Sequence, residues 1–214
     1  MIDENRADGP DAYLAGLPIG EPLPFPVDGA PSWDIFPYEG ELRVKALVAP
    51  ELPEPPRQGE EGPESCKQCA RPDEDFLWTD EHWRLSTTDE PSGLPPSSCS
   101  SRATTTTCST CRPGVPPSWA RCGWGHLPAE GWGRVEAALL SLGGIGRVHV
   151  NRWGDGAAHL HLWLIARPAG MMQLRGSTLP LWMDVLPPLS AEAGAATVGR
   201  IAAAMAAGGG TAHA

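Results

Sequence analysis

Residues 147–165 read RVHVNRWGDGAAHLHLWLI, two runs of alternating residue types around a segment rich in glycine. The alternation has the period of a β-strand and predicts one strand over residues 147–151 and a second over residues 159–165. The segment between them contains Trp-Gly-Asp-Gly at 153–156, which favours a turn and an antiparallel pair. A period of two places His159, His161 and Trp163 on one face of the second strand and the leucines on the other.

Three other segments carry secondary-structure signals. Apolar residues recur at helical spacing from Arg134 and stop at Gly143-Gly144, which predicts a helix with a glycine C-cap. Residues 75–85 hold two short apolar pieces around an acidic turn and predict a β-hairpin. The alanine-rich stretch 190–207 predicts a second helix that ends at three glycines, after which the last residues are expected to fray.

The N-terminal stretch differs in composition from the rest. Residues 1–63 alternate proline, glycine and acidic residues, with one short β-like piece at 41–48, so we expect an extended arm. The start of the chain has neither the basic nor the apolar region of a secretory signal, and no apolar stretch approaches the roughly 20 residues that cross a bilayer. We therefore expect a cytoplasmic chain with no membrane partner.

The charge balance bears on the partners. The chain has 26 acidic against 16 basic residues, a formal net charge of −10, and no basic stripe. Such a surface repels nucleic-acid backbones, so a polymeric nucleic-acid partner is not expected.

The second strand and the turn before it resemble the histidine-triad (HIT) superfamily. The signature of that superfamily is His-φ-His-φ-His-φ-φ followed closely by Arg, with Gly-Gln four residues before the first histidine. His159, His161 and Trp163 occupy the triad positions here, Arg167 the arginine position, and Gly154-Asp155 the Gly-Gln position. The resemblance covers residues 66–95 and 134–188.

The resemblance implies a fold, a domain organisation and a ligand. It implies an α+β fold, a HIT-like antiparallel sheet with flanking helices, over residues 64–190. The arm at 1–63 precedes this domain, and the alanine-rich helix and tail at 191–214 follow it. The expected ligand is a small-molecule nucleotide. A homodimer is compatible with the family, although the sequence shows no interface signal.

The resemblance also assigns roles to residues. His161 is the nucleophile on the nucleotide α-phosphate, with His159 as its catalytic neighbour. The other residues expected to bind substrate are Asn151, Gly154, Asp155, Gly156, Trp163 and Arg167. A paired structural histidine is the alternative for His159 and His161, and an ordinary strand-end residue is the alternative for Asn151.

Two positions depart from the family pattern. Trp163 replaces the third histidine, which the uridylyltransferase branch of the superfamily also lacks, so transferase chemistry stays open. Asp155 replaces a polar amide, and its carboxylate repels a phosphate unless it is protonated or bridged by a metal.

Cys66-Lys67-Gln68-Cys69 has the spacing of half a zinc site. In several HIT-like proteins a Cys-x-x-Cys binds zinc together with the first triad histidine, here His159, and a second histidine that is not visible in this sequence. Zinc is therefore the one cofactor expected, with Cys66, Cys69 and His159 as ligands. A pair of thiols without metal is the alternative.

Residues 96–130 are rich in serine, threonine, cysteine and proline and nearly lack apolar residues. One explanation is a zinc-knuckle interaction module that adds Cys108 and Cys111 to the first pair. We favour another explanation, a shifted reading frame, because the composition of the chain suggests GC-rich codons and such genes yield these residues out of frame. Reading from the third base of Pro96 gives a possible Val-Val-Leu-Leu-Glu-Pro-Arg-Asp-His-His-Asp-Leu-Leu-Asp-Leu-Pro-Pro, which resembles the HIT strand and Pro-x-x-His element that the chain otherwise lacks.

The sequence thus predicts a nucleotide hydrolase or nucleotidyl transferase. Two alternatives stay open beside it: a HIT-like protein that binds nucleotides without turnover, and a damaged HIT protein. The zinc-knuckle module is the least favoured interpretation.

Overall fold

The computed structural model describes residues 19–21, 33–40, 42–43, 45–46, 51–81, 83–87, 92–94, 98–101, 130–158 and 161–214. The chain divides into two compact units, Met1–Pro55 and Pro56–Ala214. The arm expected from the sequence covers residues 1–63, and the boundary between the two units falls between Pro55 and Pro56. Among the described residues, no helix is long and apolar enough to cross a membrane.

The contacts described within the first unit include an aromatic pair and a hydrogen bond. Phe36 and Tyr38 meet edge to face at 5.6 Å, and Arg43 Nη1 donates to the carbonyl of Gly20 at 2.7 Å. Of the expected β-like piece at 41–48, only residues 42, 43, 45 and 46 are described, and of these Arg43 alone forms a β-bridge.

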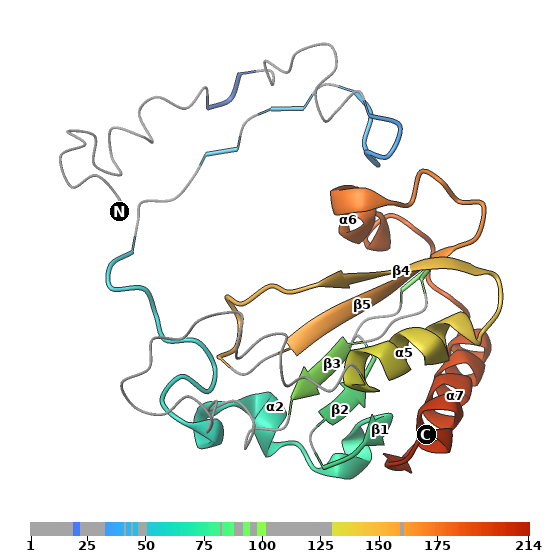
Figure 1. Cartoon of the computed structure of the whole chain (residues 1–214). Coiled ribbons are helices and arrows are strands. Elements are labelled where there is room, and N and C mark those ends of the chain that lie inside the picture. The colour runs from blue at the N-terminus through green and yellow to red at the C-terminus, as the bar shows by residue number, and fades with distance from the viewer. Residues whose placement is uncertain are drawn as a thin grey trace. The chain divides into compact units, whose positions relative to one another are not determined.

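The second unit is built around a six-stranded sheet in the order β4-β5-β3-β2-β1-β6 (Figure 1). The strands are β1 (Trp78–Thr79), β2 (Trp83–Ser86), β3 (Ser98–Ser101), β4 (Ile145–Asn151), β5 (His161–Pro168) and β6 (Thr211–Ala212). All the pairs between neighbouring strands are antiparallel. The predicted hairpin β1–β2 and the predicted pair β4–β5 are therefore confirmed, while His159 and Leu160 lie outside the described residues.

Helices complete the mixed α+β architecture. The longer two are α5 (Glu130–Leu140) and α7 (Ala191–Ala207), and both were predicted from the sequence. Glycines 143 and 144, at φ +77° and +68°, follow α5, and the Ser190 side chain accepts from Ala193 N at the start of α7. The short elements are the 3₁₀ turns η2 (Pro63–Ser65), η3 (Asp73–Asp75) and η4 (Gly176–Thr178) and the helices α2 (Lys67–Ala70) and α6 (Leu179–Met183).

The two faces of the sheet bury different clusters. The face that carries Leu85, Leu162 and Leu164, here called the helix face, packs against α5 and α7 in the main core. On the opposite face, Ile165 packs with Leu94, Leu174 and Leu179 in a second core that α6 completes. Figure 1 shows α5 and α7 side by side, with α6 on the other side of β5.

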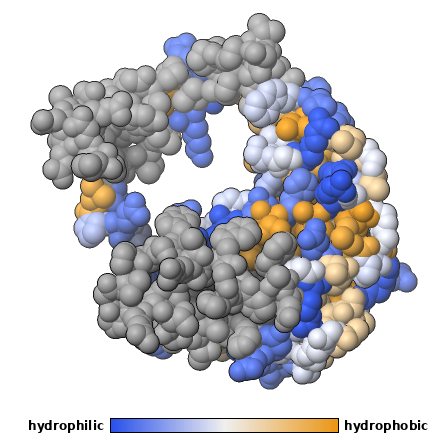
Figure 2. All heavy atoms as spheres, viewed as in Figure 1, coloured by the Kyte–Doolittle hydropathy of each residue, from blue (hydrophilic) through white to orange (hydrophobic). Residues whose placement is uncertain are grey.

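The hydropathy of the surface changes over the second unit. Figure 2 shows hydrophobic residues gathered where Figure 1 draws β4 and α5. Leu140 on α5 and Val150 on β4 are 44% and 45% exposed.

The C-terminus differs from the expectation. The last residues were expected to fray, but Thr211 and Ala212 form β6 and pair with β1. Trp78 Nε1 donates to Gly209 O at 2.9 Å, and Arg134 Nη2 donates to the same oxygen at 2.7 Å. These contacts come from residues 75 to 131 positions away in the sequence, so the local signal of three glycines does not reveal them.

Candidate functional site

The register of the strands defines a second surface, which we call the histidine face. Arg84 on β2 is opposite Ser100 on β3, which is opposite His161 on β5. Across the next pair, Asn151 on β4 is opposite Trp163 on β5. Because directly paired residues point to the same face of a sheet, and side chains alternate along each strand, the histidine face carries Arg84, His149, Asn151, His161, Trp163, Ile165 and Arg167.

Unsatisfied polar atoms concentrate on this face. Among the described residues, three buried side-chain nitrogens have no hydrogen-bond partner: Arg84 Nε, His149 Nε2 and Asn151 Nδ2. Each lies on the histidine face, and none on the helix face. A buried donor or acceptor without a partner costs about 1–3 kcal/mol, so a cluster of them on one surface is a feature of binding sites rather than of a finished core.

His149 is one of the residues of this face that the sequence interpretation missed as a site residue. It is half-buried on β4, directly opposite Ile165 and two residues before Asn151. Burial lowers the pKa of His149, and the positive charge of Arg167 lowers it further. The signal was present in the sequence, because the same strand alternation that places Asn151 on a face places His149 there too.

Arg167, expected near the substrate, is buried and engaged by its own chain. Its Nη1 donates to the carbonyls of Pro168 at 3.1 Å and Met171 at 3.4 Å and lies 3.8 Å from the sulfur of Met172. The guanidinium thus stabilises the turn that follows β5. From this position its positive charge lowers the pKa of His149.

The glycine-rich segment after β4 forms a loop that is tied down on two sides. The rings of Trp153 and Trp163 meet at 5.8 Å between centroids. Arg57 Nη1 donates to Gly154 O at 3.0 Å, and Gln58 exchanges backbone hydrogen bonds with Gly156 and Ala158. The described residues 152–158 between the two strands form no strand, so this segment is longer than the tight turn expected at 153–156.

Arg57 also places positive charge near Asp155. The pKa of Arg57 is raised chiefly by its hydrogen bond to Glu60 and by the charge of that carboxylate, with a smaller contribution from Asp155. The sequence interpretation did not single out Arg57, and its proline-rich surroundings contain no signal of a site.

The two cysteines of the Cys-x-x-Cys stretch lie together beside β2. Cys66 is buried, and Cys69 is half-buried at the other end of the turn formed by α2. Burial, followed by a hydrogen bond to the Cys66 side chain, raises the pKa of Cys69 to about 11. Arg84 Nη1 lies 3.4 Å from the Cys69 carbonyl, which places the turn at the histidine face.

The zinc ligands expected from the sequence fall only in part within the described residues. No group of three or more His, Cys, Asp or Glu side chains within the described ranges is arranged to hold a metal ion. The expected third ligand, His159, lies outside those ranges, as do Cys108 and Cys111 of the knuckle hypothesis.

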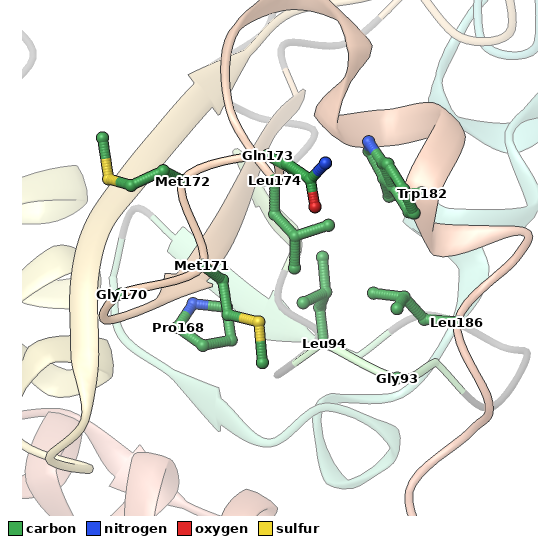
Figure 3. Close-up of a pocket in the computed structure, with 10 residues that line it drawn as sticks. All are labelled: Gly93, Leu94, Pro168, Gly170, Met171, Met172, Gln173, Leu174, Trp182 and Leu186. Carbon is green, nitrogen blue, oxygen red and sulfur yellow. The ribbon is translucent and has the colours of Figure 1, made fainter. Parts of the chain in front are cut away.

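A pocket of about 460 Å³ lies at the far end of β5 (Figure 3). Leu94, Leu174, Trp182 and Leu186 line it, and Gln173 contributes the polar side chain. Figure 3 shows Met171 at the edge of the pocket and Met172 directed away from it. His161 begins β5 and Pro168 ends it, so the pocket lies at the end of the strand away from His161.

No protein-family model matches this chain, and no curated protein matches it.

Proposed function

We propose that the chain binds a nucleotide on the histidine face and acts on its α-phosphate through His161. The observation that carries the proposal is the placement of every unpaired buried nitrogen of the described chain on the face that presents His161. A ligand with many oxygen acceptors satisfies such a set, and a nucleotide supplies them from phosphate and ribose.

The proposed reaction is a double displacement. An imidazole nitrogen of His161 attacks the α-phosphorus, forming a P–N bond as the P–O bond to the leaving group breaks and the leaving group departs with the electron pair. Water or an acceptor hydroxyl then attacks phosphorus, breaks the P–N bond and regenerates the imidazole. His159 is the neighbouring histidine in this proposal, and the loop from Gly154 to Gly156 lies near the phosphate.

Asp155 is less of an obstacle than its charge suggests. A carboxylate alone repels a phosphate, but Arg57 is close enough for its charge to act on Asp155, and it is bonded to the adjacent Gly154 carbonyl. The positive charge of Arg57 therefore offsets the negative charge of Asp155 in the loop. Trp163 and Asn151 contribute an aromatic surface and an amide on the same face.

Zinc remains part of the proposal as a structural ion. Two adjacent thiols fit half of a tetrahedral site, and their position at the histidine face is compatible with a third ligand from the segment before β5. Cys66, Cys69 and His159 would hold the ion, whose role there would be to fix the α2 turn against the sheet.

A second candidate function is nucleotide binding without turnover. Trp163 stands where the family has its third histidine, and its ring contacts Trp153. The two rings form an apolar surface at the position of Trp163. Such a surface favours binding of a nucleotide, but an indole ring cannot transfer a proton as a third histidine would.

The experiment is hydrolysis of a panel of AMP-linked and dinucleoside polyphosphate substrates by the full chain. We expect His161→Ala to lower kcat about a thousandfold or more, since a nucleophile has no substitute. His213→Ala is the matched control, because His213 follows β6 at the opposite edge of the sheet. Equal activity in wild type and His161→Ala would refute the nucleophile. No turnover, with nucleotide binding that His161→Ala weakens, would establish the second candidate.

A further inference from the structure

His149 and Asn151 are two polar side chains of β4 whose buried nitrogens, Nε2 and Nδ2, form no hydrogen bond within the fold. They are two residues apart on β4, so their Cβ atoms lie about 7 Å apart on the same face. Each has a buried nitrogen without a partner. By contrast, Val148 between them packs into the main core on the helix face.

From this placement we infer that His149, together with Asn151, binds the ribose hydroxyls of the nucleotide. The inference rests on the proposed function and adds a residue that the resemblance does not assign. Asn151 is directly opposite Trp163, and His149 is directly opposite Ile165. Ile165 is covered by Leu94, Leu174 and Leu179 in the second core, whereas Trp163 is half-buried. A sugar that lies against Trp163 has its hydroxyls toward the two polar side chains of β4.

The chemistry favours a hydroxyl over a phosphate at this position. Burial and the charge of Arg167 lower the pKa of His149, which favours a neutral imidazole that forms a hydrogen bond without a charge. A hydroxyl both donates and accepts and therefore pairs with either tautomer. The amide nitrogen of Asn151 is a donor, and a second hydroxyl oxygen is an acceptor for it.

The melting temperature of His149→Leu distinguishes a structural role of this histidine from a role in ligand binding. Replacing an unpaired buried polar group by an apolar group of similar size is nearly neutral or stabilising. His149→Leu is therefore expected to melt no lower than wild type at pH 7.5. His149→Gln keeps a hydrogen-bonding atom near the position of Nε2 and serves as the conservative control.

The test is calorimetric binding of AMP, GMP, CMP and UMP, and of their 2′,3′-dideoxy forms, to the full chain. We expect His149→Leu to weaken binding of the preferred ribonucleotide about tenfold, as expected for one lost hydrogen bond. The dideoxy form should bind wild type and His149→Leu equally, and His149→Gln should stay within a few-fold of wild type.

Three results would overturn the inference. Unchanged ribonucleotide affinity in His149→Leu, with binding that His161→Ala still weakens, would remove the role of His149 and leave the proposed function standing. Equal losses for the ribose and dideoxy forms, with a lower melting temperature, would show a structural role. Absence of binding of any of these nucleotides by wild type would overturn this inference and the proposed function together.

Discussion

Gly146 and Arg167 meet where β4 begins and β5 ends. A Cβ atom on Gly146 would lie 2.8 Å from Nη2 of Arg167 and 3.2 Å from Cα of Ala169. The glycine thus leaves room for a guanidinium that holds the turn after β5. Since the charge of the same guanidinium acts on His149, a small residue at the start of β4 influences His149 on the same strand through Arg167 on β5.

We expect Gly146→Ala to destabilise the chain by about 1–3 kcal/mol, because the new methyl group displaces the guanidinium of Arg167. The melting temperature should fall by roughly 2–4 °C per kcal/mol for a chain of this size. Gly199→Ala is the control, since nothing lies within 4 Å of its Cβ position in α7. That helical substitution should raise stability by about 0.5–1 kcal/mol. Equal melting temperatures for Gly146→Ala and wild type would contradict the steric argument.

His149 gives the stability of the chain a dependence on pH. Its pKa lies below the ordinary value of 6.5, so the unfolded state binds the proton more tightly than the folded state. The stabilisation is complete above about pH 6.5 and is lost as the pH falls through the folded pKa. We therefore expect His149→Leu to raise the melting temperature relative to wild type more at about pH 5 than at about pH 7.5. The same difference at both pH values would show that the imidazole is not the titrating group.

At the scale of elements, the sequence predicts what is locally encoded. The ends of α5 and α7 carry their own signals in Gly143-Gly144 and in Ser190, and β4 and β5 carry the strand period. β6 has only two residues and no pattern, and contacts of Trp78 and Arg134 with the chain before it hold it in place. Such an element depends on distant residues, which explains why the sequence predicted a frayed end.

The docking of β6 can be tested at two adjacent glycines. Gly210 has φ +78°, and a Cβ there would lie 2.6 Å from the Thr79 carbonyl and from the Trp78 ring. Gly209 has φ +109° with no atom within 4 Å of its Cβ position. Both alanine variants strain the backbone, but we expect Gly210→Ala to cost about 1–3 kcal/mol more in chemical denaturation because it also clashes. Equal losses in the two variants would mean that β6 is not docked on β1.

Across the whole second unit, the candidate site is assembled from segments far apart in the sequence. Arg57, the cysteine turn, Arg84 and the β4–β5 pair contribute to one face because the sheet brings β2, β3 and β5 into register. The sequence predicted His161, Asn151 and Trp163 on strands, and the register supports a shared face for them. Arg57 and Arg84 were beyond prediction, since their relation to the site depends on pairing that no local pattern encodes.

The middle of the sheet makes the reading-frame hypothesis testable. β3 pairs with β2 on one side and β5 on the other, yet its residues are Ser-Cys-Ser-Ser. β-Strands are normally enriched in Val, Ile and aromatic residues, and serine is not among the residues they favour. The alternative frame offers Val-Leu-Leu-Glu at this position, in a run that begins at residue 97.

We therefore expect the coding DNA for residues 90–135 to contain that open frame, bounded by two compensating shifts. We also expect a chain with the frame restored to be several kcal/mol more stable in denaturant, because each buried Val or Leu contributes about 1.5–3 kcal/mol. DNA with no alternative open frame across this stretch, or a restored chain no more stable than the present one, would show that the serine-rich strand belongs to the protein.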